Sequence, residues 1–128
     1  MRVFQIKLDF PPSLYSAWGR ANKKMFANKL ASDYKKKVKV LVKELYPNWV
    51  PFDKPVCFEA IYFEPNHKNR DLDNLQKIIW DAFTKAKVYK DDSLIKESKT
   101  KIEFNEQLKG SVFIKIQEIE WKINVQNV

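Results

Sequence analysis

Hydrophobic and polar residues alternate along several stretches of the chain with the two-residue period of a half-buried β-strand. Residues 2–10 show this alternation most clearly, with an apolar face formed by Phe4, Ile6, Leu8 and Phe10. Residues 55–63 are rich in Phe, Ile, Tyr and Val, which are typical of a strand. We expect two further strands over residues 94–104, where Thr100, Ile102 and Phe104 alternate, and over residues 111–119, where Val112, Ile114 and Ile116 alternate. Lys109 and Gly110 precede the last strand, and this predicts that the last two strands form a hairpin.

Two other stretches have the period of an amphipathic helix. In residues 28–45 the apolar positions are Leu30, Tyr34, Val38, Leu41 and Leu45. Between them stand Lys35, Lys36, Lys37, Lys39 and Lys43, which form a solvated face or contact DNA. In residues 73–86 the apolar stripe consists of Leu75, Ile78, Ile79, Ala82 and Phe83. Residues 13–27 show no clear period, so we expect a long ordered loop there.

The predicted order of elements is therefore β, α, β, α, β, β. This order indicates an α+β fold in which a single mixed sheet of about four strands packs against two helices. The 128 residues, 45% of them hydrophobic, suit one compact domain that extends over residues 1–128.

The charge of the chain favours a polyanionic partner. Lys and Arg number 24 against 16 Asp and Glu, a net charge of +8, and such an excess favours binding to a phosphate backbone through counterion release. Many basic proteins bind no nucleic acid, so charge alone does not decide the point. No apolar run is long enough to cross a membrane and no secretory signal opens the chain, so we expect a cytoplasmic protein. Cys57 is the single cysteine, which excludes a thiol-based zinc site in the monomer.

The chemically informative segment is Arg70-Asp71-Leu72-Asp73-Asn74-Leu75-Gln76-Lys77. Asp71 and Asp73 stand one residue apart just before the apolar stripe of the second helix. Lys77 lies one turn beyond Asp73 and shares its outward side. The polar groups of this segment therefore converge near the start of the helix.

Carboxylates held close together raise one another's proton affinity, so a cluster of Asp71, Asp73 and a third Asp favours a cation. Oxygen ligands with only His67 nearby point to Mg²⁺ or Mn²⁺ rather than Zn²⁺. Such an ion can activate water for phosphodiester hydrolysis, while Lys77 holds the scissile phosphate or the developing oxyanion.

These residues also have structural interpretations. An Asp in the first turn of a helix commonly caps it, and a cap requires only one side chain. The pair Asp91-Asp92 is equally typical of a turn before a strand, and Asp81 of an ordinary helix surface.

The run Arg70 to Lys77, with Asp81-Ala82, Thr84-Lys85-Ala86 and Asp91-Asp92, strongly resembles the RusA family of Holliday junction resolvases. Pro11-Pro12-Ser13 adds a weaker match. The resemblance implies a Mg²⁺-dependent endonuclease of recombination and repair, a homodimer that resolves four-way junctions by paired symmetric nicks. Its motif places the three metal-binding, catalytic carboxylates on Asp71, Asp73 and Asp92, and the catalytic lysine on Lys77. We expect DNA contacts from the basic residues nearby, namely Arg70, Lys68, Arg20, Lys23 and Lys24.

The chain departs from the family pattern at two places. Leu14-Tyr15-Ser16 follows Pro11-Pro12-Ser13 where the family often has Asn, so substrate contacts in that loop do not carry over. Lys87 follows Thr84-Lys85-Ala86 where the family commonly has Gly, which provides an easy left-handed helix stop. We therefore expect the second helix to end differently from the family pattern, which would move Asp92.

The leading hypothesis has two rivals, a catalytically silent binder of branched DNA and a metal-dependent nuclease for flaps, forks or RNA. The acidic set favours an enzyme, because carboxylates without a metal repel the DNA backbone. Geometry also favours a homodimer, since two sites related by a two-fold axis can reach both strands of a junction. Apolar residues on the strands, including Phe58, Ile61 and Phe63, are expected to supply surface for the dimer.

Overall fold

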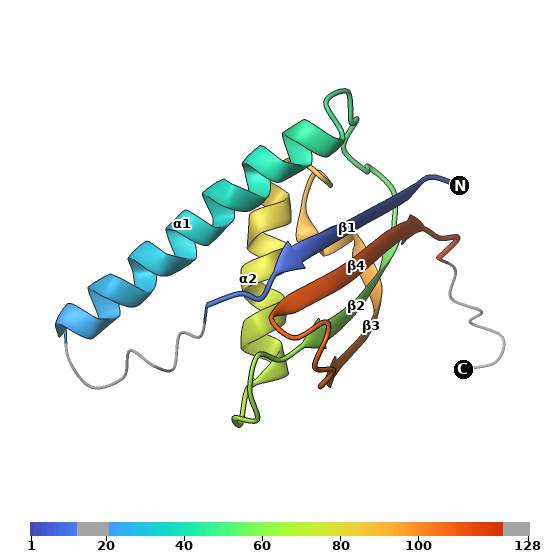
Figure 1. Cartoon of the computed structure of the whole chain (residues 1–128). Helices are drawn as coiled ribbons and strands as arrows, with labels where there is room; N and C mark the ends of the chain where they lie inside the picture. The colour runs from blue at the N-terminus through green and yellow to red at the C-terminus, as the bar shows by residue number, and fades with distance from the viewer. Residues whose placement is uncertain (13–20, 122–128) are drawn as a thin grey trace, which may run out of the picture.

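The computed structural model describes residues 1–12 and 21–121, and it describes side chains in the first helix from residue 28 onward. The elements are β1 (Val3–Asp9), α1 (Ala21–Leu45), β2 (Val56–Phe63), α2 (Leu72–Lys85), the short 3₁₀ helix η2 (Asp92–Leu94), β3 (Ile95–Glu103) and β4 (Ser111–Glu118) (Figure 1). One four-stranded mixed sheet has the strand order β1-β4-β2-β3. The predicted α+β class and the order of elements are confirmed.

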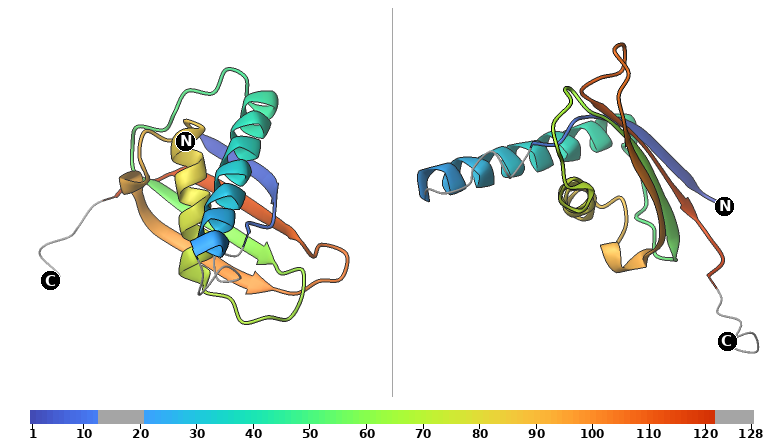
Figure 2. Two further views of the ribbon diagram at one scale, coloured as in Figure 1. Left: turned by 90° about the vertical axis from the view of Figure 1, so that its left-hand side faces the viewer. Right: turned by 90° about the horizontal axis from the view of Figure 1, so that it is seen from below.

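Both helices cover the same face of the sheet and leave the other face bare (Figure 2). The alternation in β1 explains which face of this strand packs against the helices, because Phe4, Ile6 and Leu8 are buried while the residues between them are exposed. The apolar stripe of α2 completes the core, with Leu75, Ile78, Ile79, Ala82 and Phe83 all buried. Removing apolar surface from water in this single layer is the main stabilising contribution to the fold.

The predicted hairpin between the last two strands is wrong, because β2 lies between them. β2 pairs with β3 in parallel and with β4 in the antiparallel sense. Most residues of β2 are buried, whereas β3 is largely exposed and rich in charge. A strand that is apolar on both faces is stabilised most in the interior of a sheet, and a charged strand suits an edge. The Lys109-Gly110 turn therefore connects two strands that are not neighbours, since β3 and β4 lie on opposite sides of β2.

The first helix begins at Ala21, so the expected loop over residues 13–27 is wrong for residues 21–27. Residues 21–27 are rich in Ala, Lys and Met, which favour a helix even where no apolar period is visible. The rest of that loop, residues 13–20, lies outside the described residues. Further along α1, Tyr34 and Val38 are buried as predicted, whereas Leu45 is exposed.

No helix in the described part of the chain has the length and apolar character needed to cross a membrane.

Candidate active site

The start of α2 carries the first two predicted carboxylates. Asp71 is the N-cap, with extended backbone angles, and its Oδ1 accepts a hydrogen bond of 2.9 Å from the backbone N–H of Asp73. The side chains of both residues are exposed. The capping role considered for Asp71 is therefore confirmed, and this role fixes its carboxylate at the positive end of the helix dipole, against the backbone N–H of Asp73.

Arg70 anchors the loop that leads into this cap. Its side chain is only 11% exposed, and its guanidinium donates to Glu64 Oε2 at 3.2 Å and to the carbonyl oxygen and Oδ1 of Asn66 at 2.8 and 2.6 Å. The guanidinium also lies 5.2 Å from the centre of the Phe10 ring. These contacts hold the end of β2, the loop and the cap together, so Arg70 can contact a phosphate only with donors that they do not occupy. No local sequence period pointed to Glu64 as its partner.

One side of α2 contacts β3 through Gln76. Its Oε1 accepts a hydrogen bond of 2.9 Å from Ser98 Oγ of β3. Asp73 and Lys77 are three residues before and one residue after Gln76, and both are exposed. One helical turn therefore presents a carboxylate and an ammonium group on neighbouring parts of the same surface.

The second acidic region is η2, where two adjacent carboxylates have different surroundings. Asp91 is the N-cap, and its Oδ2 accepts a hydrogen bond of 3.0 Å from the backbone N–H of Ser93. Hydrogen bonds from Ser93 hold the pKa of Asp91 below its ordinary value. Asp92 is half-buried, and its pKa is raised by burial and then by the negative charges of Asp91 and Asp81. Asp91 therefore stabilises the turn, while the surroundings of Asp92 disfavour the negative charge of its carboxylate.

The structure does not bring the three predicted carboxylates together within one chain. Within residues 1–12 and 21–121, no group of three or more His, Cys, Asp or Glu side chains could hold a metal ion. Asp71 and Asp73 stand at the beginning of α2, a 14-residue helix about 20 Å long. Asp92 comes after its end, in η2, and its acidic neighbours are Asp91 and Asp81. The acidic set is therefore divided between the two ends of α2.

The C-terminal end of α2 has a left-handed turn, although no glycine is present there. Lys87 has φ 61°, and the N–H groups of Lys87 and Val88 donate to the carbonyls of Thr84 (3.2 Å) and Phe83 (3.0 Å). This is the Schellman pattern of hydrogen bonds. The expectation that α2 ends differently is wrong, because the chain adopts the same stop with a lysine.

The interpretation of Asp81 as an ordinary surface residue of the helix is incomplete. Its carboxylate lies 3.7 Å from Lys35 Nζ and so links α2 to α1. One of the lysines assigned to a solvated face of α1 thus has a structural partner within the chain, although a partly exposed pair of this kind contributes little stability.

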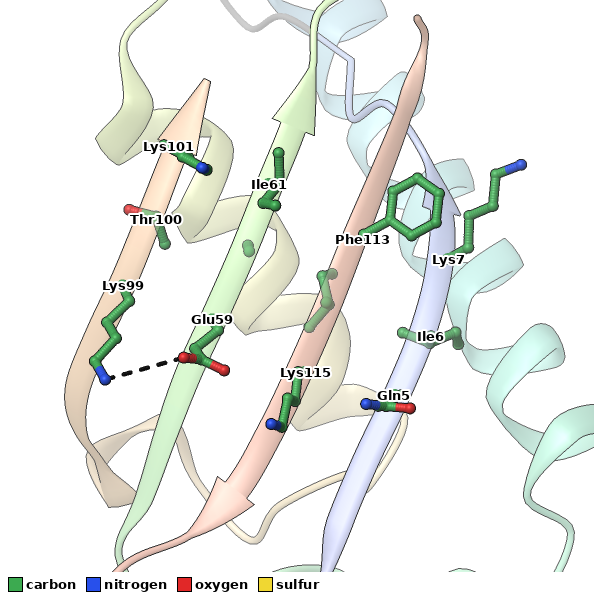
Figure 3. A pocket seen from close by; sticks show the side chains of 12 residues that line it. Gln5, Ile6, Lys7, Glu59, Ile61, Lys99, Thr100, Lys101, Phe113 and Lys115 are labelled. Atoms are coloured by element: carbon green, nitrogen blue, oxygen red, sulfur yellow. Dashed lines mark ion pairs between the residues drawn. The ribbon is translucent and has the colours of Figure 1, made fainter. Parts of the chain in front are cut away.

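A shallow hollow of about 800 Å³ lies on the bare face of the sheet (Figure 3), and none of the predicted acidic residues lines it. Lys7, Lys99, Lys101 and Lys115 stand around it with Glu59, and Ile61 and Phe113 form part of its floor. Phe63 packs edge-on against Phe113, with ring centres 5.6 Å apart. Ile61 and Phe63 therefore lie on the bare face, but Phe63 is only 7% exposed there and offers little surface to a partner. Phe58 does not lie on this face, because it is fully buried in the core below the helices.

The predicted DNA contacts fall in two places. Lys68 is exposed in the loop before α2, close to the acidic cap in sequence. Arg20 lies outside the described residues, as do the side chains of Lys23 and Lys24 in the first turns of α1.

Comparison with known proteins gives a family match that includes both acidic regions. Residues 9–117 match the model of a family described as endodeoxyribonuclease RusA. The chain is similar to the crossover junction endodeoxyribonuclease RusA of Aquifex aeolicus (strain VF5), with 43% identity over 65 residues, about half the length of each chain (51%). The proteins of that name from Enterobacteria phage HK97 and Escherichia coli (strain K12) are 27% and 28% identical. These two matches cover 72% and 74% of this chain, and 76% and 78% of the relatives.

Proposed function

This chain belongs to the RusA family of endodeoxyribonucleases, and we propose that it resolves four-way DNA junctions by paired, symmetric nicks in recombination and repair. The observation that carries the proposal is the pair of exposed carboxylates fixed at the start of α2, with Lys77 on the same side of the helix. An acidic pair of this kind, in a chain of net charge +8, suits metal-assisted hydrolysis of a phosphate backbone.

The donor set has the chemistry of a magnesium site. Asp71, Asp73 and Asp92 offer only carboxylate oxygens, the ligands that Mg²⁺ and Mn²⁺ prefer. One chain alone supplies the ligands in two separate parts, which explains why no acidic group of three is found among its described residues. The donors therefore fit the ion in kind, and we propose that a second chain brings them together.

A symmetric homodimer provides that second chain. In such a pair, Asp71 and Asp73 of one subunit meet the partner subunit's Asp92, and the two-fold axis creates two equivalent sites. Two sites are also what the paired cutting of a junction requires. Exposed apolar residues are available for contacts with a partner, among them Phe113, which is 38% exposed on the bare face.

Each side chain has a distinct role in the proposed reaction. Asp71, Asp73 and Asp92 would hold a Mg²⁺ ion, which when bound would activate water and stabilise negative charge on the phosphate. The cap at Asp71 keeps its carboxylate in place before DNA binds. Lys77 contacts a non-bridging oxygen of the scissile phosphate and stabilises the charge that develops there. Arg70 keeps the loop before the cap in position through Glu64 and Asn66.

Synthetic four-way, forked, flapped and linear DNA, with an RNA hairpin, incubated with Mg²⁺ or with excess chelator, tests the proposal. We expect symmetric nicks in the four-way junction only with Mg²⁺ or Mn²⁺, and junction binding that persists in chelator. Full cleavage in excess chelator contradicts the metal assignment. Binding without cleavage under any metal condition supports the silent binder instead, and faster cutting of flaps, forks or RNA reassigns the substrate.

A further inference from the structure

The first helix carries most of the net charge of the chain. α1 contains eight lysines and two acidic residues, a net charge of +6 out of the +8 of the whole sequence. Three of the lysines, Lys29, Lys36 and Lys43, recur every seven residues. Seven residues are nearly two helical turns, so these three side chains lie along one line of the helix surface, which we call the lysine line.

The lysine line points away from the core. All three of its side chains are exposed. The buried side chains of α1 are on the opposite side of the helix, at Ala31, Tyr34, Val38 and Val42. The helix therefore has one side that belongs to the core and another that presents positive charge to the surroundings of the protein.

No carboxylate of the described residues neutralises the lysine line, since none of its lysines forms an ion pair there. Asp33 lies between them in sequence, but it is half-buried and forms no such pair either. Lys39 stands three residues after Lys36 and four before Lys43, a spacing at which like charges repel. The line therefore costs the helix stability, whereas a helix face that is only solvated usually mixes both signs of charge. A polyanionic partner accounts for this arrangement.

The surroundings of the lysine line favour duplex DNA over other polyanions. The apolar side of α1 is occupied by the core, so the helix cannot insert that side into a lipid surface. Tyr34 is the only aromatic residue between residues 28 and 45, and it is buried, so an unpaired base finds no ring to stack on along this stretch. The line extends over fourteen residues, about 21 Å, which corresponds to about six base pairs of a duplex.

The lysine line and the carboxylates of α2 belong to the same side of the molecule. α1 crosses α2, where Lys35 Nζ lies 3.7 Å from the carboxylate of Asp81. Both helices cover one face of the sheet and begin at the same end of the molecule, and the N-terminal part of α1 extends away from the sheet (Figures 1 and 2). A duplex that follows the line therefore leads toward the end of the molecule where Asp71 and Asp73 stand.

We propose that the lysine line, Lys29, Lys36 and Lys43, binds the phosphates of one duplex arm of the junction. The inference rests on the proposed function, which makes branched DNA the substrate, and it identifies the surface that holds an arm while the carboxylates act on a strand. Lysines contact phosphates as point charges and read no bases. The line therefore contributes affinity and the direction of the arm, without a preference for sequence.

Removal of the three charges tests the contact through its salt dependence. The line variant combines Lys29→Gln, Lys36→Gln and Lys43→Gln, substitutions that keep a similar helix propensity. Its affinity for a synthetic four-way junction is measured by fluorescence anisotropy in excess chelator, from about 50 to about 200 mM salt. We expect Kd to rise about tenfold or more, and the slope of log Kd against log salt to become shallower by about 1 for each lysine.

The matched control removes the same charge from positions that do not form a line. Lys7, Lys54 and Lys109 are exposed and lie on β1, before β2 and before β4. The variant with Gln at these three positions is expected to change Kd and the salt slope much less than the line variant does. Circular dichroism checks that both variants are folded. An equal loss of affinity in the two variants would show that net charge alone attracts the DNA, and it would overturn the proposal.

Tethered cutting gives a second test that reports position rather than affinity. Lys36→Cys in the Cys57→Ser background is labelled with an iron–EDTA reagent, which cuts nearby DNA when ascorbate and peroxide are added. We expect a cluster of cuts within the duplex part of an arm. Lys7→Cys in the same background is the matched control and is expected to give no cluster. Cuts from position 36 that fall only in the single-stranded part of a forked DNA would overturn the assignment to a duplex.

The outcomes separate this surface from the proposed function. A weaker Kd with a shallower salt slope in the line variant, together with clustered cuts from position 36, supports the lysine line. A line variant with wild-type Kd and slope overturns the lysine line and leaves the proposed function in place. Because both tests are made without Mg²⁺, they can succeed for a chain that cuts no DNA when Mg²⁺ is added, and that result overturns the proposed function alone.

Discussion

The two ends of α2 present carboxylates in opposite electrostatic settings. At the beginning, Asp71 and Asp73 are exposed, and the Asp71 side chain accepts a backbone N–H at the positive end of the helix dipole. Beyond the other end, Asp92 is half-buried beside Asp91 and Asp81, and these surroundings raise its pKa. One end favours negative charge and the other makes it costly.

This difference indicates what each end lacks. The beginning of α2 has two exposed carboxylates, which the proposed metal site completes with a third, and η2 has a carboxylate whose negative charge is disfavoured by its surroundings. Within the chain the two are held apart by a rigid helix. The proposed site, completed between two subunits, would account for an acidic set divided in this way.

Neutralising either end is expected to produce the largest effect. Asp71→Asn, Asp73→Asn and Asp92→Asn should each lower junction cleavage by roughly 100-fold or more, as when a group directed at transition-state charge is lost. DNA binding should persist or strengthen, because a negative charge facing the phosphates is removed. Asp81→Asn is the control and should keep nearly full activity. Cleavage rates and gel-shift affinities measure both quantities, and an active Asp92→Asn enzyme would remove η2 from the site.

Lys77 belongs to the beginning of α2, and its removal should have the next largest effect. Lys77→Ala is expected to lower turnover at saturating junction by about 10-fold to 100-fold, with little change in Kd, because its charge acts mainly on the transition state. Lys85→Ala, at an exposed position on the same helix, is the matched control. Normal turnover of Lys77→Ala at saturation is inconsistent with a catalytic lysine.

The two acidic residues of η2 should respond to pH in opposite ways. The pKa of Asp92 is raised above 3.8, so its ionisation costs stability as the pH rises through the window above that value. Asp92→Asn removes this cost and should raise Tm slightly at pH 7. The pKa of Asp91 is lowered, so its stabilising contribution is present above 3.8 and is lost as the pH falls through the lowered pKa. Asp91→Asn should therefore lower Tm at pH 7.

Thermal denaturation at pH 7 and pH 3 measures this contrast. The difference in Tm between the two variants should shrink at pH 3. Equal shifts of the same sign at pH 7 would show that the surroundings of Asp91 and Asp92 do not differ as described.

The left-handed turn after α2 should give the smallest effect. Lys87 has φ 61°, a conformation that costs a residue with a side chain about 1 kcal/mol or more relative to Gly. Lys87→Gly is expected to raise the free energy of unfolding by about 0.5–1 kcal/mol, because part of the gain is offset by greater freedom in the unfolded chain. Urea denaturation measures the change. Cleavage should be unaffected, and a loss of cleavage would mean that the turn does more than lead the chain to η2.

The elements of this fold were predictable where a period was strong. The alternation of β1 and the stripe of α2 placed both elements to within a residue or two. The beginning of α1 was missed because residues 21–27 are helical without an apolar stripe. The place of β3 in the sheet differs from the prediction, because the turn sequence Lys109-Gly110 favours pairing between β3 and β4, the two strands that it connects. Pairing is decided instead by how much apolar surface β2 buries between two strands.

The acidic residues of the site could be identified from their motif, whereas their arrangement could not. Spacing placed Asp71, Asp73 and Lys77 on one part of α2, because helical geometry is local. The position of Asp92 depends on the path of the chain after the helix, including a left-handed residue that sequence rules assign to glycine. Its distance from the other carboxylates is a tertiary property that the motif does not contain.

Complementation between two inactive variants tests the divided site most directly. Asp73→Asn subunits are mixed with Asp92→Asn subunits and allowed to exchange before a four-way junction and Mg²⁺ are added. A site shared between subunits gives each mixed dimer one intact site, so nicking should return in up to half of the dimers, with each junction cut once. If each site lies within a single chain, every site in the mixture carries a substitution. Nicking that stays at the level of the separate variants would therefore contradict the shared site.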